Sequence, residues 1–149
     1  MIDHSKAIDA LNDLLARNYD AEKGYKQAAE QVEETRLVSW FNSKAQERYD
    51  FGHEIKEEIR SLGGTPEKGT TVKGDLHRTW LNVKSALSLD TTEAILEECE
   101  RGEETFVETY DEALKDTALP ASTRSLLIGQ RNKAASALAR VEQLEETHD

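Results

Sequence analysis

Asp50 and His53 lie three residues apart in the stretch QERYDFGHEI, residues 46–55, and are the first pair in the sequence that could do chemistry. Residues at this spacing lie on one face of a helix, where a carboxylate and an imidazole can share a metal ion. Four-helix bundles with two bound metal ions use Glu-x-x-His pairs that point into the bundle. Asp50 and His53 would bind metal in this way only if both side chains pointed inward.

The helix that carries this pair is expected to turn it toward solvent. Apolar residues recur every three or four positions over residues 37–62, and the pattern stops at a Gly-Gly pair, which predicts a helix and its end. The apolar positions centre on Arg48. At about 100° per residue, Asp50 lies about 200° and His53 about 140° around the helix from Arg48. We therefore expect Arg48 to point into the core and the pair to lie on the charged outer face.

The same periodicity predicts three more helices, over residues 8–32, 90–113 and 122–144. The connections within the first two and the last two helices are short, so each pair should form an antiparallel hairpin. The middle connection, residues 63–90, is long enough to run the length of the bundle, and we expect a short helix in it over residues 77–87. This pattern predicts an all-α, ferritin-like four-helix bundle that forms a single domain over residues 1–149.

The composition limits the kinds of partner. The chain has 149 residues and a net charge of -11 at pH 7, so nucleic acid and anionic membranes would repel it. Its one cysteine, Cys99, allows neither a disulfide framework nor a multi-cysteine metal cluster. The N-terminal residues lack a signal-like apolar run, and no stretch approaches the roughly 20 apolar residues of a membrane span. We therefore expect a cytoplasmic protein that binds neither nucleic acid nor membrane.

Polar residues occupy the inward positions near the middle of the predicted bundle. They are Asn18 and Glu22 on the first helix, Arg48 on the second and Gln130 on the fourth. We expect Glu22 to pair with Arg48, while the two side-chain amides satisfy the remaining hydrogen-bond donors. The fixed positive charge of Arg48 would repel a metal cation. These residues therefore predict a buried structural network that specifies one packing of the helices, with no cofactor.

Four stretches of the chain, in this order, resemble an uncharacterised bacterial family of four-helix bundles within the ferritin-like superfamily, classed as a domain of unknown function. The stretches are LNDLLARNYDAEKGYKQAAE (residues 11–30), AQERYDFGHEIKEEIRSLGGTP (45–66), HRTWLNVKSAL (77–87) and ILEECERGEE (95–104). The resemblance covers nearly the whole chain and implies the ferritin-like fold. It implies no established activity.

The chain is also similar, more distantly, to bacterioferritin. On that comparison Asn18 stands at the first glutamate ligand of the dimetal site. Arg48 and Phe51 stand at the Glu-x-x-His pair of the second helix. Gln130 and Lys133 stand at the second such pair. The resemblance thus implies that other residues replace the usual metal ligands.

His77, Arg78 and Trp80 form a dense polar and aromatic cluster within the middle connection. Trp and Arg are favoured at protein interfaces, so the cluster could be an interaction surface. Aromatic side chains also supply packing area, so Trp80 could instead dock the short helix onto the bundle. Both interpretations stay open.

Glu22, Glu98 and Glu103 are the alternative metal site. Glu98 and Glu103 lie about 60° and 80° from the centre of the inward face of the third helix, where they could bind iron together with Glu22. No histidine on that face completes the set, and solvated helix charge is the simpler interpretation.

The sequence therefore leaves two functions of different class. The first is a non-catalytic bundle with a scaffold, binding or stress-related role, which acts as a homo-oligomer or with another protein. The second is an iron-binding redox or storage protein that uses the non-standard carboxylate set. The inward guanidinium of Arg48 favours the first over an enzyme. The metal content of the purified protein separates the two.

Overall fold

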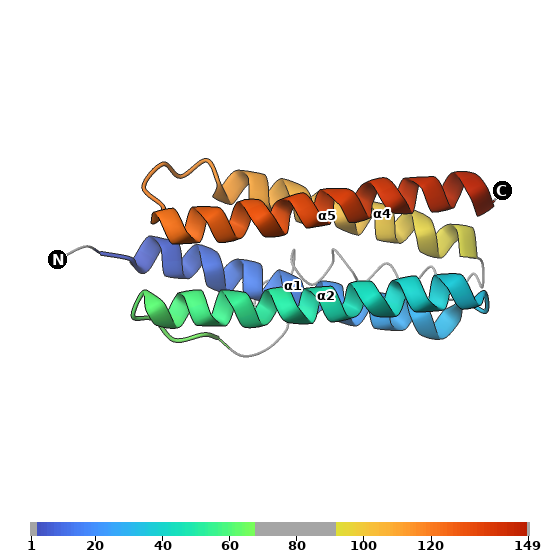
Figure 1. The fold of residues 1–149 in the computed structure, drawn as a ribbon, viewed down its shortest axis with the longest axis horizontal. Coiled ribbons are helices and arrows are strands. Elements are labelled where there is room, and N and C mark those ends of the chain that lie inside the picture. The colour runs from blue at the N-terminus through green and yellow to red at the C-terminus, as the bar shows by residue number, and fades with distance from the viewer. Residues whose placement is uncertain (1–2, 68–91, 149) are drawn as a thin grey trace.

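The computed structural model describes residues 3–67 and 92–148 (Figure 1). These residues form four α-helices and no strand, which confirms the all-α prediction. The helices are α1 (Ser5–Gln31), α2 (Thr35–Ser61), α4 (Thr92–Ala113) and α5 (Ala121–His148). None of the described helices is long and apolar enough to cross a membrane.

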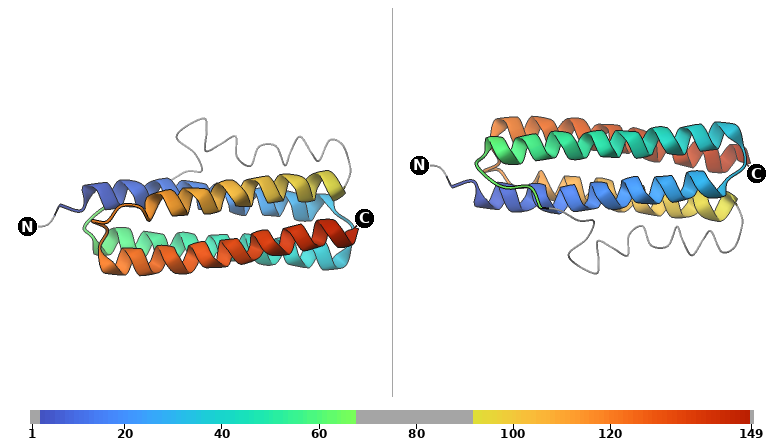
Figure 2. Two further views of the ribbon diagram at one scale, coloured as in Figure 1. Left: turned by 90° about the horizontal axis from the view of Figure 1, so that it is seen from above. Right: turned by 90° about the horizontal axis from the view of Figure 1, so that it is seen from below.

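The four helices form a bundle of two antiparallel hairpins. α1 packs most extensively on α2, and α4 on α5, while weaker contacts join α1 to α4 and α2 to α5. α2 and α4 therefore lie diagonally opposite each other and run in the same direction (Figure 2). α2 ends at one end of the bundle and α4 begins at the other. The expected helix over residues 77–87, with its cluster His77, Arg78 and Trp80, lies outside the described residues.

Two glycines end α2, as the sequence pattern predicts. The N–H of Gly64 donates to the carbonyl of Ile59 (2.9 Å), and the N–H of Gly63 donates to that of Arg60 (3.0 Å). This pair of bonds is a Schellman motif, and Gly63 has the left-handed φ of +88° that the motif requires. A Cβ at Gly64 would lie 2.8 Å from Cγ2 of Ile8. Because Gly64 has no side chain, the backbone that follows α2 can pack directly against Ile8 of α1.

The start of α5 is tied to α2 by hydroxyl groups. α5 begins after Pro120, whose carbonyl accepts from the N–H of Arg124 (2.9 Å). In the first turn, Ser122 and Thr123 both donate to Oε2 of Glu58 on α2, at 2.8 and 2.6 Å. These bonds tie the first turn of α5 to the last turn of α2.

Apolar side chains from all four helices fill the bundle along its length. Each large side chain that is fully buried contributes about 1.5–3 kcal/mol to folding. Fully buried examples are Leu11, Leu15, Phe41, Ile55, Ile59, Ile95, Leu96, Leu127 and Val141. Near the middle this core is interrupted by polar side chains.

Replacing Gly63 by alanine should lower the free energy of unfolding by about 1–2 kcal/mol, because a Cβ disfavours the left-handed conformation. Gly63→Asn is the matched control and should lose less, since asparagine tolerates that conformation. Urea denaturation of both variants measures the difference. Equal losses would show that φ at this position is not the cause.

Candidate functional site

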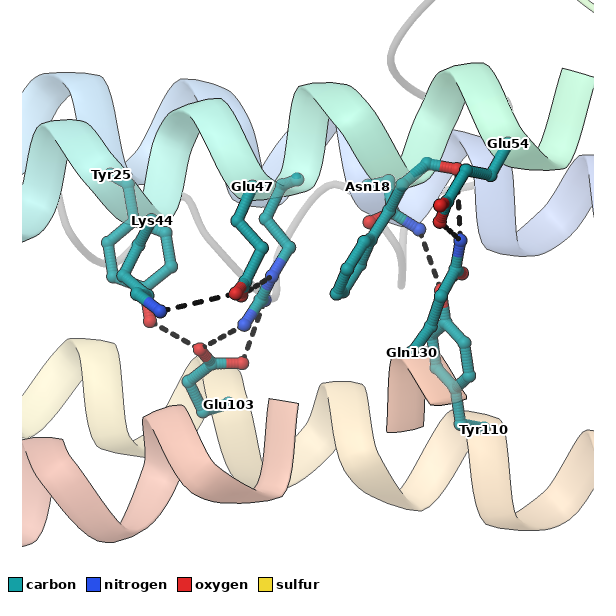
Figure 3. A network of polar contacts seen from close by, with 10 residues as sticks. Asn18, Tyr25, Lys44, Glu47, Glu54, Glu103, Tyr110 and Gln130 are labelled. Atoms are coloured by element: carbon teal, nitrogen blue, oxygen red, sulfur yellow. Dashed lines mark hydrogen bonds and ion pairs between the residues drawn. The ribbon is translucent and has the colours of Figure 1, made fainter. Parts of the chain in front are cut away.

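Arg48 of α2 and Glu103 of α4 form a buried ion pair at the centre of the bundle (Figure 3). Both side chains are 0% exposed. Nη1 of Arg48 donates to Oε1 of Glu103 (2.8 Å), and Nη2 donates to Oε2 (2.6 Å). Because α2 and α4 are diagonal neighbours, the pair spans the core from corner to corner. Two parallel bonds of this kind fix the orientation of both groups as well as their distance.

Neighbouring groups complete the surroundings of both charges. The hydroxyl of Tyr25, on α1, donates to Oε2 of Glu103. The guanidinium carbon of Arg48 lies 4.4 Å from the ring centre of Phe106 and 5.6 Å from those of Tyr25 and Phe51. Aromatic faces attract a cation most strongly when water is excluded. The carboxylate therefore has three donors, and the guanidinium is enclosed by rings.

The ionisation states of this centre follow from burial and charge. Burial alone would lower the pKa of Arg48, but the charge of Glu103 raises it above its usual value. Burial and the same carboxylate raise the pKa of Tyr25 well above its ordinary range, so Tyr25 keeps the proton that it donates. Burial also raises the pKa of the Cys99 thiol, which packs nearby and stays protonated. Oε1 of Glu47 lies 3.6 Å from Nε of Arg48, and its Oε2 accepts from Nζ of Lys44 (3.2 Å), so two carboxylates and two cations balance each other here. With the phenol and the thiol protonated, the centre contains no activated nucleophile.

A second network lies further along the bundle and joins all four helices (Figure 3). Nδ2 of Asn18 on α1 donates to the hydroxyl of Tyr110 on α4 (2.9 Å), which donates to Oε1 of Gln130 on α5 (2.6 Å). Nε2 of Gln130 donates to α2, at the carbonyl of Phe51 (3.1 Å) and at Oε1 of Glu54 (2.9 Å). Asn18 and Gln130 are buried at the inward positions that the periodicity predicts.

The expected pairing of Glu22 with Arg48 is wrong. Oε2 of Glu22 accepts from Lys26 of the same helix (2.8 Å), and its side chain is 16% exposed. Glu22 lies at the edge of the α1 core face, where a lysine four residues on is the nearer partner. The long side chain of Arg48 instead reaches across the bundle to Glu103.

The sequence contains a signal that identifies Glu103 as a core residue. Leu96, Glu103 and Tyr110 are spaced seven residues apart on α4, and all three are 0% exposed. Residues seven apart lie on the same stripe of a helix. The expected angle of about 80° between Glu103 and the centre of the inward face places this residue at the margin of that face.

Asp50 and His53 lie on the exposed outer face of α2, as predicted. Oδ1 of Asp50 accepts from Nε2 of Gln46 (3.0 Å). The ring of His53 packs edge-to-face on Tyr49, with 4.6 Å between ring centres. The two side chains therefore have ordinary surface contacts within their own helix.

The alternative metal ligands Glu22, Glu98 and Glu103 are not brought together. Each carboxylate binds a different cation: Lys26 for Glu22, Arg101 for Glu98 (2.8 Å) and Arg48 for Glu103. Within residues 3–67 and 92–148, no group of three or more His, Cys, Asp or Glu side chains could hold a metal ion. The set does not form a site in this conformation.

Asp20 is a buried carboxylate that sequence reasoning missed. It is 5% exposed, and its Oδ2 atom has no hydrogen-bond partner among the described residues. Burial raises its pKa to about 7, against the opposing charges of Lys23 and Arg17. The residue lies about 200° around α1 from Asn18, so periodicity alone predicts that it is exposed.

The fold and this centre define an all-α four-helix bundle with a polar, charge-balanced core. The chain belongs to a family described as a domain of unknown function (DUF2383), which matches residues 6–116. This match confirms the expectation of a family without an assigned activity. The matched residues contain Tyr25, Arg48 and Glu103 but end before α5. No curated protein matches the chain.

Removing one partner of the buried pair should be far more damaging than removing both. Arg48→Met or Glu103→Leu alone should lower the free energy of unfolding by about 3–5 kcal/mol. Arg48→Met leaves the buried carboxylate of Glu103 without a cation, and Glu103→Leu leaves the guanidinium of Arg48 with only its 3.6 Å contact to Glu47. The double variant should lose much less than the sum of the two. Glu104→Leu, at the exposed neighbouring position of α4, is the control and should change stability by no more than about 0.5 kcal/mol. Urea denaturation measures all four; additive effects of the core pair would contradict the assignment.

Asp20 should make stability depend on pH. Its pKa of about 7 in the folded chain exceeds its ordinary value of 3.8, so the folded state binds the proton more tightly. Stability from this group is therefore complete below about pH 4 and is lost as pH rises to about 7. Asp20→Asn should gain stability relative to the wild type over that range, as measured by urea denaturation. Asp50→Asn, on the exposed surface, should show no such trend; a similar trend there would contradict the assignment to Asp20.

Proposed function

We propose that this chain is a non-catalytic, ferritin-like bundle in which a polar network takes the place of a dimetal centre. Its role is then that of a scaffold or binding protein, and its surface carries the function. The observation that supports this proposal is the fully buried fork between Arg48 and Glu103 at the middle of the bundle.

Three features support the ferritin-like placement. α2 and α4 run in the same direction and are joined between opposite ends of the bundle, which is the connectivity of ferritin-like bundles. The similarity of residues 11–30 and 45–66 to bacterioferritin favours the same superfamily, and with it a bacterial, cytoplasmic protein. On that comparison Asn18, Arg48 and Gln130 stand at ligand positions, and all three are buried.

The residues at this centre do not fit a metal ion. Both oxygens of Glu103 already accept hydrogen bonds, from Arg48 and from Tyr25. A divalent cation would have to displace the guanidinium or share the space with it, and like charges in a buried site repel strongly. Asn18 and Gln130 supply amides where dimetal proteins supply carboxylates and imidazoles. No metal-dependent step is therefore assigned to this chain.

Elemental analysis of protein from iron-supplemented cells tests the proposal. Iron should be far below one ion per chain, because Arg48 occupies the centre, and Glu103→Gln should not change it. Glu104→Gln is the matched control, since Glu104 is the exposed neighbour on the same helix. Stoichiometric iron that is lost in Glu103→Gln but kept in Glu104→Gln would overturn the proposal and favour the alternative, an iron-binding redox or storage protein.

A further inference from the structure

The outward face of α5 is exposed and its own residues carry no charge over six turns, although exposed Arg140 and Glu142 flank it near its C-terminal end. Its residues differ in size but are all uncharged: Ala121, Ser125, Ile128, Gly129, Asn132, Ser136, Ala139 and Gln143. We call this set the α5 face. In a chain of which 33% is charged, a solvated helix face normally carries charged residues. An unpartnered face of this composition is unusual for this protein and requires an explanation.

Acidic residues are absent from most of α5. From Ala121 to Val141, α5 contains no Asp or Glu, although the whole chain has 30 of them. By contrast, α4 exposes Glu97, Glu104 and Glu108. Two copies that met through such an acidic face would repel each other. The α5 face is a surface on which a second copy can approach without that repulsion.

Two residues at the centre of the α5 face suit contact with another helix. Ile128 is 43% exposed, and Tyr49 is the other large hydrophobic residue with comparable exposure in the described chain. Gly129 follows it, and a Cβ there would meet no atom within 4 Å. Packing within the chain therefore does not require this glycine, which weakens a helix interior. A missing side chain does allow a neighbouring helix to approach closely.

The charges beside the α5 face are complementary to those of a second copy. Lys133 lies on the side of α5 that adjoins α2, with its Nζ 5.9 Å from the ring centre of Phe51. The outer face of α2 beside it exposes Asp50, Glu54 and Glu57. If two α5 helices meet antiparallel about a two-fold axis, the α2 helices of both copies lie on the same side of the contact, and each is set back from it by its own α5. Lys133 of each copy then lies on the same side of the contact as the acidic face of the other.

We propose that the α5 face is the contact through which two copies of this chain form a two-fold dimer. The α5 helices are antiparallel, which also aligns their dipoles favourably. Asn132 lies midway between Ala121 and Gln143 and is therefore at the axis. Ile128 of one copy lies against Ser136 of the other. This inference goes beyond the proposed function and does not depend on whether the centre of the bundle binds metal.

Sedimentation of the full chain and of two glutamate variants tests the dimer. The wild type should sediment as a dimer at micromolar concentrations. Ser136→Glu places an unpaired charge against Ile128 of the other copy and should raise the dissociation constant by about a hundredfold or more. Ser5→Glu is the matched control, because it adds the same charge at an exposed position of α1, the helix diagonally opposite α5. A monomeric wild type, or equal dissociation of both variants, would overturn the proposal.

Cysteine cross-linking tests the orientation. Cys99 is buried, so a single introduced cysteine should be the reactive thiol in the native chain. Asn132→Cys should form disulfide-linked dimers with copper phenanthroline as oxidant. Asn42→Cys, at an exposed position of α2, should not. In an antiparallel contact, residue 125 of one copy lies far from residue 125 of the other. Efficient disulfide formation between two copies of Ser125→Cys would therefore overturn the antiparallel arrangement.

Discussion

The bundle is organised around one desolvated ion pair. Removing Arg48 and Glu103 from water costs several kcal/mol for each charge. The two parallel bonds between them, the hydroxyl of Tyr25 and the surrounding rings offset that cost. They can do so only when α1, α2 and α4 have one relative position. The pair therefore contributes specificity of packing more than net stability, and it sets the rotation of the diagonal helices about their own axes.

The two polar layers are related by a shared helical register. Tyr25 and Asn18 are seven residues apart on α1, and Glu103 and Tyr110 are seven apart on α4. Seven residues correspond to about 10 Å along a helix, so the layers are about 10 Å apart. Because α1 and α4 are antiparallel, each tyrosine meets the polar residue of the opposite helix. One layer is centred on an ion pair and the other on side-chain amides and a phenol that end at the exposed carboxylate of Glu54, yet both use the same geometry.

The helices and the burial of Arg48, Asn18 and Gln130 could be predicted from the sequence, because a period of three to four residues reports which side of a helix faces the core. The partner of Arg48 could not be predicted from the angles of single helices. Glu22 and Glu103 are both near their core faces, and the choice depends on which helices are diagonal and how far a guanidinium reaches. The burial of Asp20 could not be predicted either, because it lies about 200° around α1 from Asn18, away from the apolar positions that mark the core face in the sequence.

The placement of the two charges on different hairpins has a consequence for folding. Arg48 belongs to the α1–α2 hairpin and Glu103 to the α4–α5 hairpin. Each hairpin can gain its own apolar contacts early, since its helices are adjacent in sequence. Docking the hairpins must bury both charges at nearly the same moment. A half-docked bundle would leave the charge of Arg48 or of Glu103 desolvated and without its partner. Partly assembled states are thus penalised, and the chain should pass between open and closed bundle in a single cooperative step.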